Sequence, residues 1–115
     1  MARAEVEVDF SAEVLTLTRA LADPNRLRIF LALRVTERCV RDLVDSQNLP
    51  QPLVSHHLHV LSRAGLVQAR WSEGFKLYAL RTEGLAAARD LAIELLNPES
   101  IDPLGLPGGN AACCQ

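Results

Sequence analysis

The stretch QPLVSHHLHVLSRAGLV, residues 51–67, decides the fold of this chain. On a helix that turns by about 100° per residue, Val54, Leu58 and Leu61 fall on one side. Leu53, His57 and Val60 flank this apolar side. The opposite side carries Pro52, Ser55, His56, His59 and Arg63. Gly65 suits the left-handed backbone conformation that often ends a helix. The stretch therefore predicts a helix over about 51–64, with one face for the core and one face free of long acidic side chains.

Two helices are predicted near the N-terminus. Ser11 is a good N-cap before apolar residues at helical spacing, which predicts a first helix over 11–22. Asp23 then caps a second helix, and Pro24 occupies its first position, where a missing N–H is harmless. This second helix runs to about residue 33, and its apolar side chains are expected to face largely inward: Leu27, Ile29, Phe30, Leu31 and Leu33.

The segments on either side of residues 51–67 complete the pattern. A short helix is predicted near 39–46, and the residues QNLP (47–50) break it. After Leu66 the apolar period changes, and LVQAR and FKLYAL read as two strands joined by a turn that contains Glu73-Gly74. A last helix follows over 82–96, with Thr82 as its cap.

This order of elements predicts a mainly α fold with a small β-hairpin, the winged helix-turn-helix. Residues 1–97 would form one DNA-binding and dimerisation domain. Residues 98–115 are rich in Pro and Gly and have no periodicity, so we expect a flexible tail that carries Cys113 and Cys114.

The polar face of the central helix predicts contact with DNA. Its side chains donate and accept hydrogen bonds at base edges, and Arg63 suits a phosphate. A lone polar helix face is more often simply solvated. Here the short helix and tight turn in front, and the hairpin behind with Arg70 and Lys76, favour a helix that enters the major groove.

Composition agrees with a single small domain. The 115 residues, 49% of them hydrophobic, suffice for one domain and its core. The net charge is −2, but the middle of the chain is basic and both ends are acidic, so the average does not exclude DNA. No apolar run is long enough to span a bilayer, and MARAEVEVDF does not resemble a signal peptide. Together with an odd count of three cysteines, this favours free thiols in the cytoplasm.

Several segments resemble the ArsR/SmtB family of bacterial metal-responsive winged-helix repressors. They are LTRALADPNRLRIFLAL, RCVRDLV, QPLVSHHLHVLSRAGLV and KLYAL, within residues 14–81. The resemblance implies a homodimer held by the first and last helices, which binds a two-fold symmetric DNA operator and releases it when a metal ion binds. It also implies that Gln51, Ser55 and His56 read bases, with His59 as a further candidate, and that Arg70 and Lys76 contact phosphate or the minor groove.

The resemblance leaves the inducing ion open. One family type binds zinc, nickel or cobalt through Asp, His and Glu of the last helix, but residues 82–100 contain no His. Another type uses two thiolates at the third helix, in a segment like ELCVCDL. Here the segment reads ERCVRDL: Cys39 matches the first cysteine, and Arg41 replaces the second. Cys113 and Cys114 remain, on a tail that spans up to ~50 Å when extended.

Three thiolates suit some ions better than others. Trivalent arsenic and antimony bind three thiolates as a pyramid, so we place As(III) and Sb(III) first as inducers. Cadmium or lead comes second among the candidate inducers and mercury third. Structural zinc is bound by four ligands, one more than the three thiolates supply. No resident cofactor is required.

Alternatives to metal sensing stay open at this point. Cys39 alone is more commonly a small buried hydrophobe. Oxidation of Cys39 or of the tail pair would make a redox-switched repressor on the same fold, and a module that binds only protein is a further reading. An enzyme would need Cys39 paired with His57. Because His57 is better explained as a helix-packing residue with a hydrogen bond, no enzymatic activity is expected.

Overall fold

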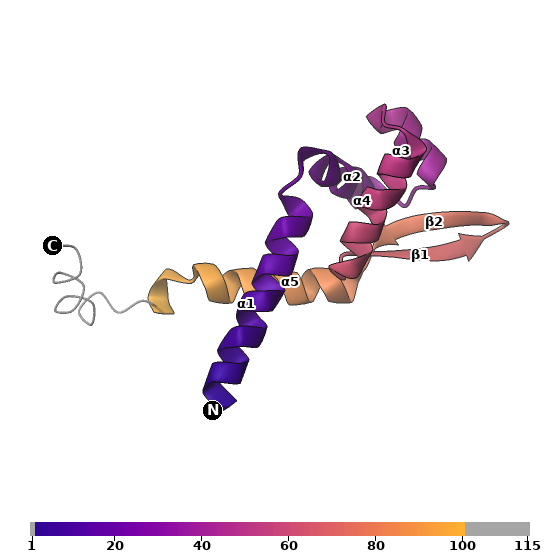
Figure 1. Ribbon diagram of the computed structural model, residues 1–115. Coiled ribbons are helices and arrows are strands. Elements are labelled where there is room, and N and C mark those ends of the chain that lie inside the picture. Colours follow the sequence, from indigo (N-terminus) through magenta and orange to yellow (C-terminus); the bar gives the residue numbers. More distant parts are fainter. Residues whose placement is uncertain (1, 101–115) are drawn as a thin grey trace, which may run out of the picture.

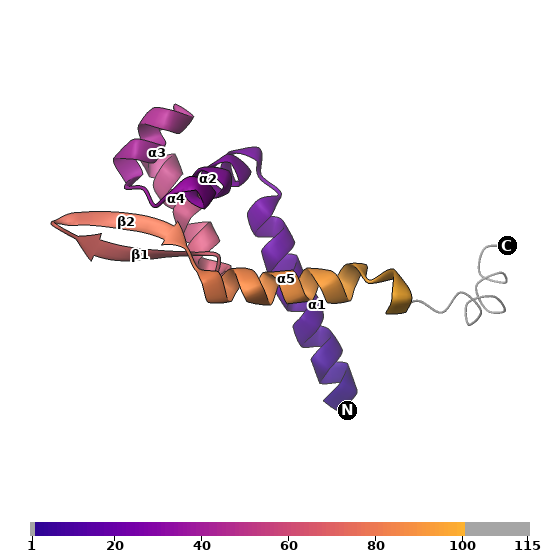
Figure 2. The same ribbon diagram turned by 180° about the vertical axis from the view of Figure 1, so that it is seen from behind.

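The computed structural model describes residues 2–100. Its elements follow the order α1 (Ala2–Leu21), α2 (Pro24–Val35), α3 (Val40–Gln47), α4 (Gln51–Arg63), β1 (Val67–Ser72), β2 (Phe75–Leu80), α5 (Thr82–Leu96) and a single 3-10 turn, Pro98–Ser100. Helices α2, α3 and α4 gather beside the hairpin, whereas α1 and α5 cross and project away from them (Figures 1 and 2). The predicted winged helix-turn-helix is confirmed.

Helix α1 begins earlier than predicted. Ser11 does not cap it but lies inside it, because the upstream residues 2–10 include two Ala and two Glu and neither Gly nor Pro, and they continue the helix to Ala2. The hydroxyls of Thr16 and Thr18 donate to backbone carbonyls one turn earlier, each at 2.9 Å, so these polar groups are satisfied within the helix.

Helix α2 begins as predicted and packs differently. The Asp23 carboxylate accepts hydrogen bonds from the backbone N–H groups of Asn25 (2.8 Å) and Arg26 (3.1 Å), which caps the helix. Ile29 and Leu33 are buried, but Leu27 and Leu31 are 42% and 50% exposed, which corrects the prediction that they face inward. They lie two positions from the buried pair, about 200° around the helix, so they point away from the core.

The core surrounds the apolar face of α4. Val54, Leu58 and Leu61 are completely buried, and the other buried apolar residues pack around them: Ala20, Ile29, Leu33, Leu43, Leu66 and Val67. Helices α1, α2 and α3 and strand β1 each contribute to this cluster. The position of α4 is therefore fixed by its buried face, and its opposite face is left to solvent.

The hairpin closes through a two-residue turn. Val67 pairs with Leu80 at its base and Ser72 pairs with Phe75 at its tip. Both turn residues have positive φ, 51° at Glu73 and 82° at Gly74, which matches the right-handed twist of the strands. Arg38, in the linker before α3, adds a short antiparallel bridge to Tyr78, with N–H to O distances of 3.0 and 2.7 Å.

The backbones of α5 and of the corner between α4 and β1 touch directly. A Cβ atom on Gly84 would lie 1.6 Å from the carbonyl oxygen of Gly65. Only a residue without a side chain allows α5 to start this close to the corner.

Candidate DNA-binding interface and thiol site

The turn between α3 and α4 is tight because Asn48 adopts the left-handed conformation, with φ of 54°. Asparagine tolerates this region better than most residues. The carbonyl of Pro50 then accepts from the N–H groups of Leu53 and Val54, both at 3.1 Å, and α4 begins. This turn brings the two helices together as a helix-turn-helix.

Helix α4 presents a continuous polar face to solvent. All five of its residues predicted to contact DNA are exposed: Gln51, Ser55, His56, His59 and Arg63. The helix contains no acidic residue, and Arg63 lies in its last turn. The face therefore offers amide, hydroxyl, imidazole and guanidinium groups without a carboxylate that would repel a phosphate.

His57 is the polar residue on the buried face of α4. Its side chain is 4% exposed, and its Nδ1 atom lies 3.3 Å from Nη1 of Arg26. Burial is the main cause that lowers the pKa of His57. The charge of Asp23 opposes this effect in part, and the charges of Arg26 and His56 lower the pKa further. The prediction that His57 packs within its helix and makes a hydrogen bond is confirmed.

The hairpin forms a wing whose cations already have partners. Arg70 Nε donates to Glu37 Oε2 at 3.0 Å, and the guanidinium also contacts Oε1 of the same carboxylate. This hydrogen bond raises the pKa of Arg70. The Lys76 ammonium lies 5.5 Å from the centre of the Tyr78 ring, within cation–π range. Arg70 and Lys76 both remain exposed to solvent.

Cys39 is the residue immediately before α3 and occupies its N-cap position. Its side chain is half-buried and makes no capping hydrogen bond. Its neighbour Arg38 forms the bridge to the wing, so Cys39 lies between the wing and the helix-turn-helix. Cys113 and Cys114 lie outside the described residues, and among the side chains that the structure describes, residues 11–99, no three of His, Cys, Asp or Glu gather as a metal site.

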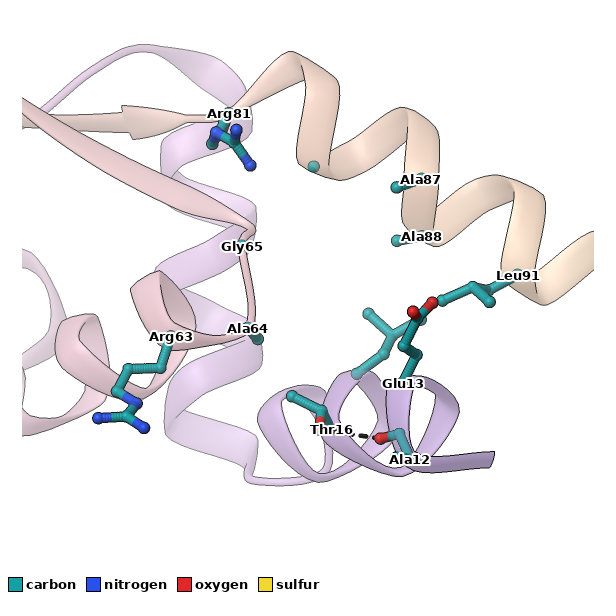
Figure 3. Close-up of a pocket in the computed structure, with 12 residues that line it drawn as sticks. Ala12, Glu13, Thr16, Arg63, Ala64, Gly65, Arg81, Ala87, Ala88 and Leu91 are labelled. Carbon is teal, nitrogen blue, oxygen red and sulfur yellow. Dashed lines mark hydrogen bonds between the residues drawn. The ribbon is translucent and has the colours of Figure 1, made fainter. Parts of the chain in front are cut away.

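A hollow of about 450 Å³ lies where α1, the corner after α4 and α5 meet. Figure 3 shows small side chains around it and Arg81 directed into it, and Glu13 of α1 and Leu91 of α5 also line it. Arg63 also lines the hollow, but its guanidinium is directed away from the centre of this space in Figure 3. Apolar side chains on α1 and α5 are also exposed, namely Leu15, Ile93, Leu95 and Leu96.

Comparison with known proteins gives the same assignment as the fold. Residues 23–69, from the cap of α2 into β1, match the family described as "Bacterial regulatory protein, arsR family". The chain is 36% identical over 73 residues to the arsenical resistance operon repressor of Staphylococcus xylosus, a match that covers 64% of this chain and 70% of that protein. The chain belongs to the arsR family.

Other arsR-family proteins extend the comparison. The HTH-type transcriptional repressor SmtB of Mycobacterium tuberculosis is 50% identical over 70 residues, which cover 61% of this chain and 52% of SmtB. The chain thus spans about half the length of that relative. A homodimeric winged helix-turn-helix domain from Mycobacterium bovis, a possible ArsR-family regulator, superposes with a TM-score of 0.62 at 28% identity, over 84% of each chain.

These arsR-family relatives are named as transcriptional repressors or regulators, not as enzymes. Within residues 2–100, none of the helices combines the length and the apolar character that crossing a membrane requires.

Two contacts of this arsR-family chain were not predicted from its sequence. Glu37 pairs with Arg70 across 33 positions, and Arg26 contacts His57 across 31. Neither pair has a periodic spacing within one element that would indicate it. The sequence predicted that His57 makes a hydrogen bond, because a buried His prefers a partner, but it did not indicate which residue supplies that partner.

Proposed function

We propose that this chain is a transcriptional repressor that binds a two-fold symmetric operator as a homodimer, with α4 in the major groove. The observation that carries the proposal is the exposed, acid-free polar face of α4 opposite a fully buried apolar face. In this role Gln51, Ser55 and His56 contact base edges, and His59 is a further candidate. The family assignment and the names of the relatives support it.

Phosphate contacts would come from both ends of this surface. Arg63 is exposed in the last turn of α4, and Arg70 and Lys76 are exposed on the wing. Arg70 reaches a phosphate only in competition with Glu37. Such contacts position the protein and release counterions, which makes binding depend on salt.

The homodimer would use α1 and α5. Their exposed apolar side chains and the hollow between them are surfaces that a second copy would cover. The homodimeric relative from M. bovis supports this arrangement. Sedimentation at micromolar concentration tests it: we expect a dimer, and a monomer that persists there would contradict it.

The proposal that the protein binds a specific operator is tested by selecting DNA duplexes with it. The protein is used to select duplexes from a random pool, and binding to the selected duplex and to random DNA is measured by fluorescence anisotropy over a range of salt. We expect a two-fold symmetric sequence, a log–log salt slope clearly below zero and at least ~10³-fold preference for the selected duplex. Absence of any preference would reject the repressor and favour a module that binds only protein.

We further propose that As(III) or Sb(III) is the inducer, bound by Cys39, Cys113 and Cys114. Three thiols replace three hydroxides of arsenous acid, each As–S bond forming as one water leaves, and the pyramidal ion is then saturated. Cys39 supports this because, within the part of the chain that the structure describes, its side chain is half-buried before α3 and makes no hydrogen bond that caps the helix. The assignment of residues 98–115 as the tail that delivers the other two thiols is part of the proposal.

Release of DNA would follow from the position of Cys39. Any shift of this residue moves α3, which packs against α4, and the Arg38–Tyr78 bridge to the wing. A coupling of ~1 to 3 kcal/mol is enough for a clear response. Titration of the reduced protein on its selected duplex with arsenite, antimonite, cadmium, lead, mercury and zinc identifies the ion. Release by cadmium, lead or mercury alone would replace the metalloid, and release by peroxide alone would indicate a redox switch.

A further inference from the structure

The Arg26 guanidinium joins three helices. Arg26 lies in the first turn of α2, and its Nε donates to the carbonyl of Ala20 at 2.8 Å while its Nη2 donates to the carbonyl of Arg19 at 3.1 Å. Both carbonyls belong to the last turn of α1, where few backbone N–H groups remain to bond them; that of Arg19 also accepts from the N–H of Ala22 at 3.4 Å. Arg26 therefore caps the C-terminal end of α1.

The third group of the same guanidinium reaches α4. Nη1 of Arg26 lies 3.3 Å from Nδ1 of His57. A guanidinium donates and never accepts, so Nδ1 is the acceptor and the neutral imidazole carries its proton on Nε2. The lowered pKa of His57 agrees with a ring that stays neutral beside a cation.

His57 is not explained by packing alone. Its Nε2 atom is buried and, among the described residues, has no hydrogen-bond partner. A buried donor without an acceptor destabilises a fold relative to an apolar side chain of similar shape. Leucine would fill the same region of the core without this penalty, so the feature specific to histidine here is the acceptor that it offers to Arg26.

We propose that Arg26 and His57 are positioning residues that fix the orientation of α4 relative to α1, and that operator discrimination depends on them although neither contacts DNA. The inference rests on the proposed function, in which α4 reads bases and α1 lies at the dimer interface. His56 is exposed on α4 directly beside His57, so a rotation of α4 about its axis displaces the face that reads bases. In a dimer the same rotation occurs twice.

The test compares His57→Leu with His57→Asn. Leucine keeps an apolar side chain of similar size and removes the acceptor, whereas the amide of asparagine places a polar atom close to the position of Nδ1. Each variant is measured on the selected duplex and on random DNA at one salt concentration, and its unfolding in urea is measured in parallel. For His57→Leu we expect roughly tenfold or greater loss of the ratio of selected to random affinity, unchanged affinity for random DNA and stability equal to or above that of the wild type. His57→Asn should retain most of the ratio.

Arg26→Lys provides a second variant, because lysine keeps the charge but cannot bond both α1 carbonyls and His57 at once. Arg26→Lys should reduce the ratio of selected to random affinity, as His57→Leu does. Arg28→Lys is the matched control, since Arg28 is exposed on the same helix and contacts only Asn25 at 3.4 Å among the described hydrogen bonds; it should behave as the wild type.

Two results would overturn the proposal. One is an unchanged affinity ratio in folded His57→Leu or Arg26→Lys. The other is a variant in which affinity for the selected duplex and for random DNA falls by the same factor while the free energy of unfolding also falls. That result would assign the pair a purely structural role. A wild-type protein that shows no preference for any duplex would instead reject the proposed function.

Discussion

The guanidinium of Arg70 in β1 is bound to the carboxylate of Glu37 in the linker between α2 and α3, with Nε 3.0 Å from Oε2. The contact holds the wing to the segment that leads into Cys39. It also reduces the positive charge that the wing presents, because a phosphate must compete with Glu37 for the same guanidinium.

Glu37→Gln should therefore strengthen DNA binding. The substitution frees Arg70 for a phosphate, so we expect affinity for selected and random duplexes to rise several-fold and the salt slope to steepen by up to about one unit. Anisotropy titrations over 50 to 200 mM salt, a range in which such slopes are well resolved, measure both quantities.

Arg70→Ala supplies the control for this effect. In the Arg70→Ala background, Glu37→Gln should leave the salt slope unchanged, because the guanidinium that the loss of Glu37 would free for a phosphate is no longer present. An equal gain in both backgrounds would attribute the effect to overall charge.

Lys76→Ala should weaken binding to all sequences and make the salt slope shallower by about one unit, because a phosphate contact is lost. An unchanged slope would mean that Lys76 does not reach the DNA backbone.

Ser55→Ala and His56→Ala should weaken binding to the selected duplex by ~1 to 3 kcal/mol each and binding to random DNA much less, because a base contact is lost. Competition titrations with the two duplexes give both values. Ser62→Ala lies on the same helix outside the proposed contact set and serves as the control. Equal losses on both duplexes would assign Ser55 or His56 to phosphate.

Cys39→Ser, Cys113→Ser and Cys114→Ser should each leave DNA binding intact and abolish or strongly reduce release by arsenite, because two thiolates leave a pyramidal ion one ligand short. Release is followed on the selected duplex in the presence of a non-thiol reductant. A normal response of Cys39→Ser, with loss in the two tail variants, would replace Cys39 by an exogenous thiol. Retained arsenite responses in all three, with loss of a peroxide response, would identify a redox switch.

The stability of the protein should fall in mild acid because of His57. Since its folded pKa lies below the ordinary value of 6.5, the unfolded chain binds the proton first as the pH drops through that value. Unfolding free energy measured in urea should therefore decrease from pH 7.5 to pH 5.5, and by less in His57→Leu. The same decrease in both proteins would assign the acid sensitivity to other groups. The lowered pKa of Asp23 acts at more acidic pH.

Gly84→Ala should destabilise the fold by about 1 to 3 kcal/mol or more, because the new methyl group would meet the carbonyl of Gly65 at 1.6 Å. Gly74→Ala separates conformational strain from collision: its φ is +82°, but nothing lies within 4 Å of the added atom, so about 1 to 2 kcal/mol is expected. Thermal unfolding of both variants makes the comparison, and a smaller effect at Gly84 than at Gly74 would show that α5 moves away easily.

The elements that depend on local chemistry were predictable from the sequence. Asp23-Pro24 marks the start of α2, Glu73-Gly74 marks the hairpin turn, and the apolar spacing of α4 identifies its buried face. The start of α1 was not predictable in the same way, because a serine that suits an N-cap is also tolerated inside a helix.

The pairs that depend on distant contacts were beyond local reasoning. The sequence indicated that Arg70 and Lys76 are basic, but the distance between Glu37 and Arg70 depends on how the linker crosses the wing. Likewise, Leu27 and Leu31 satisfy an apolar helical pattern, and only the neighbours of α2 decide which side of that pattern is covered.

Trp71 is the single tryptophan of the chain and is 72% exposed on the wing, opposite Lys76 in the strand register. Intrinsic tryptophan emission from this protein therefore originates from one site, and that site is separate from the apolar core. An emission spectrum would report the surroundings of the wing without any attached dye, and the accessibility of the indole to a neutral quencher such as acrylamide could be followed while DNA or an ion is added. Unfolding would change this signal little, so it is better suited to following ligand binding than to following denaturation.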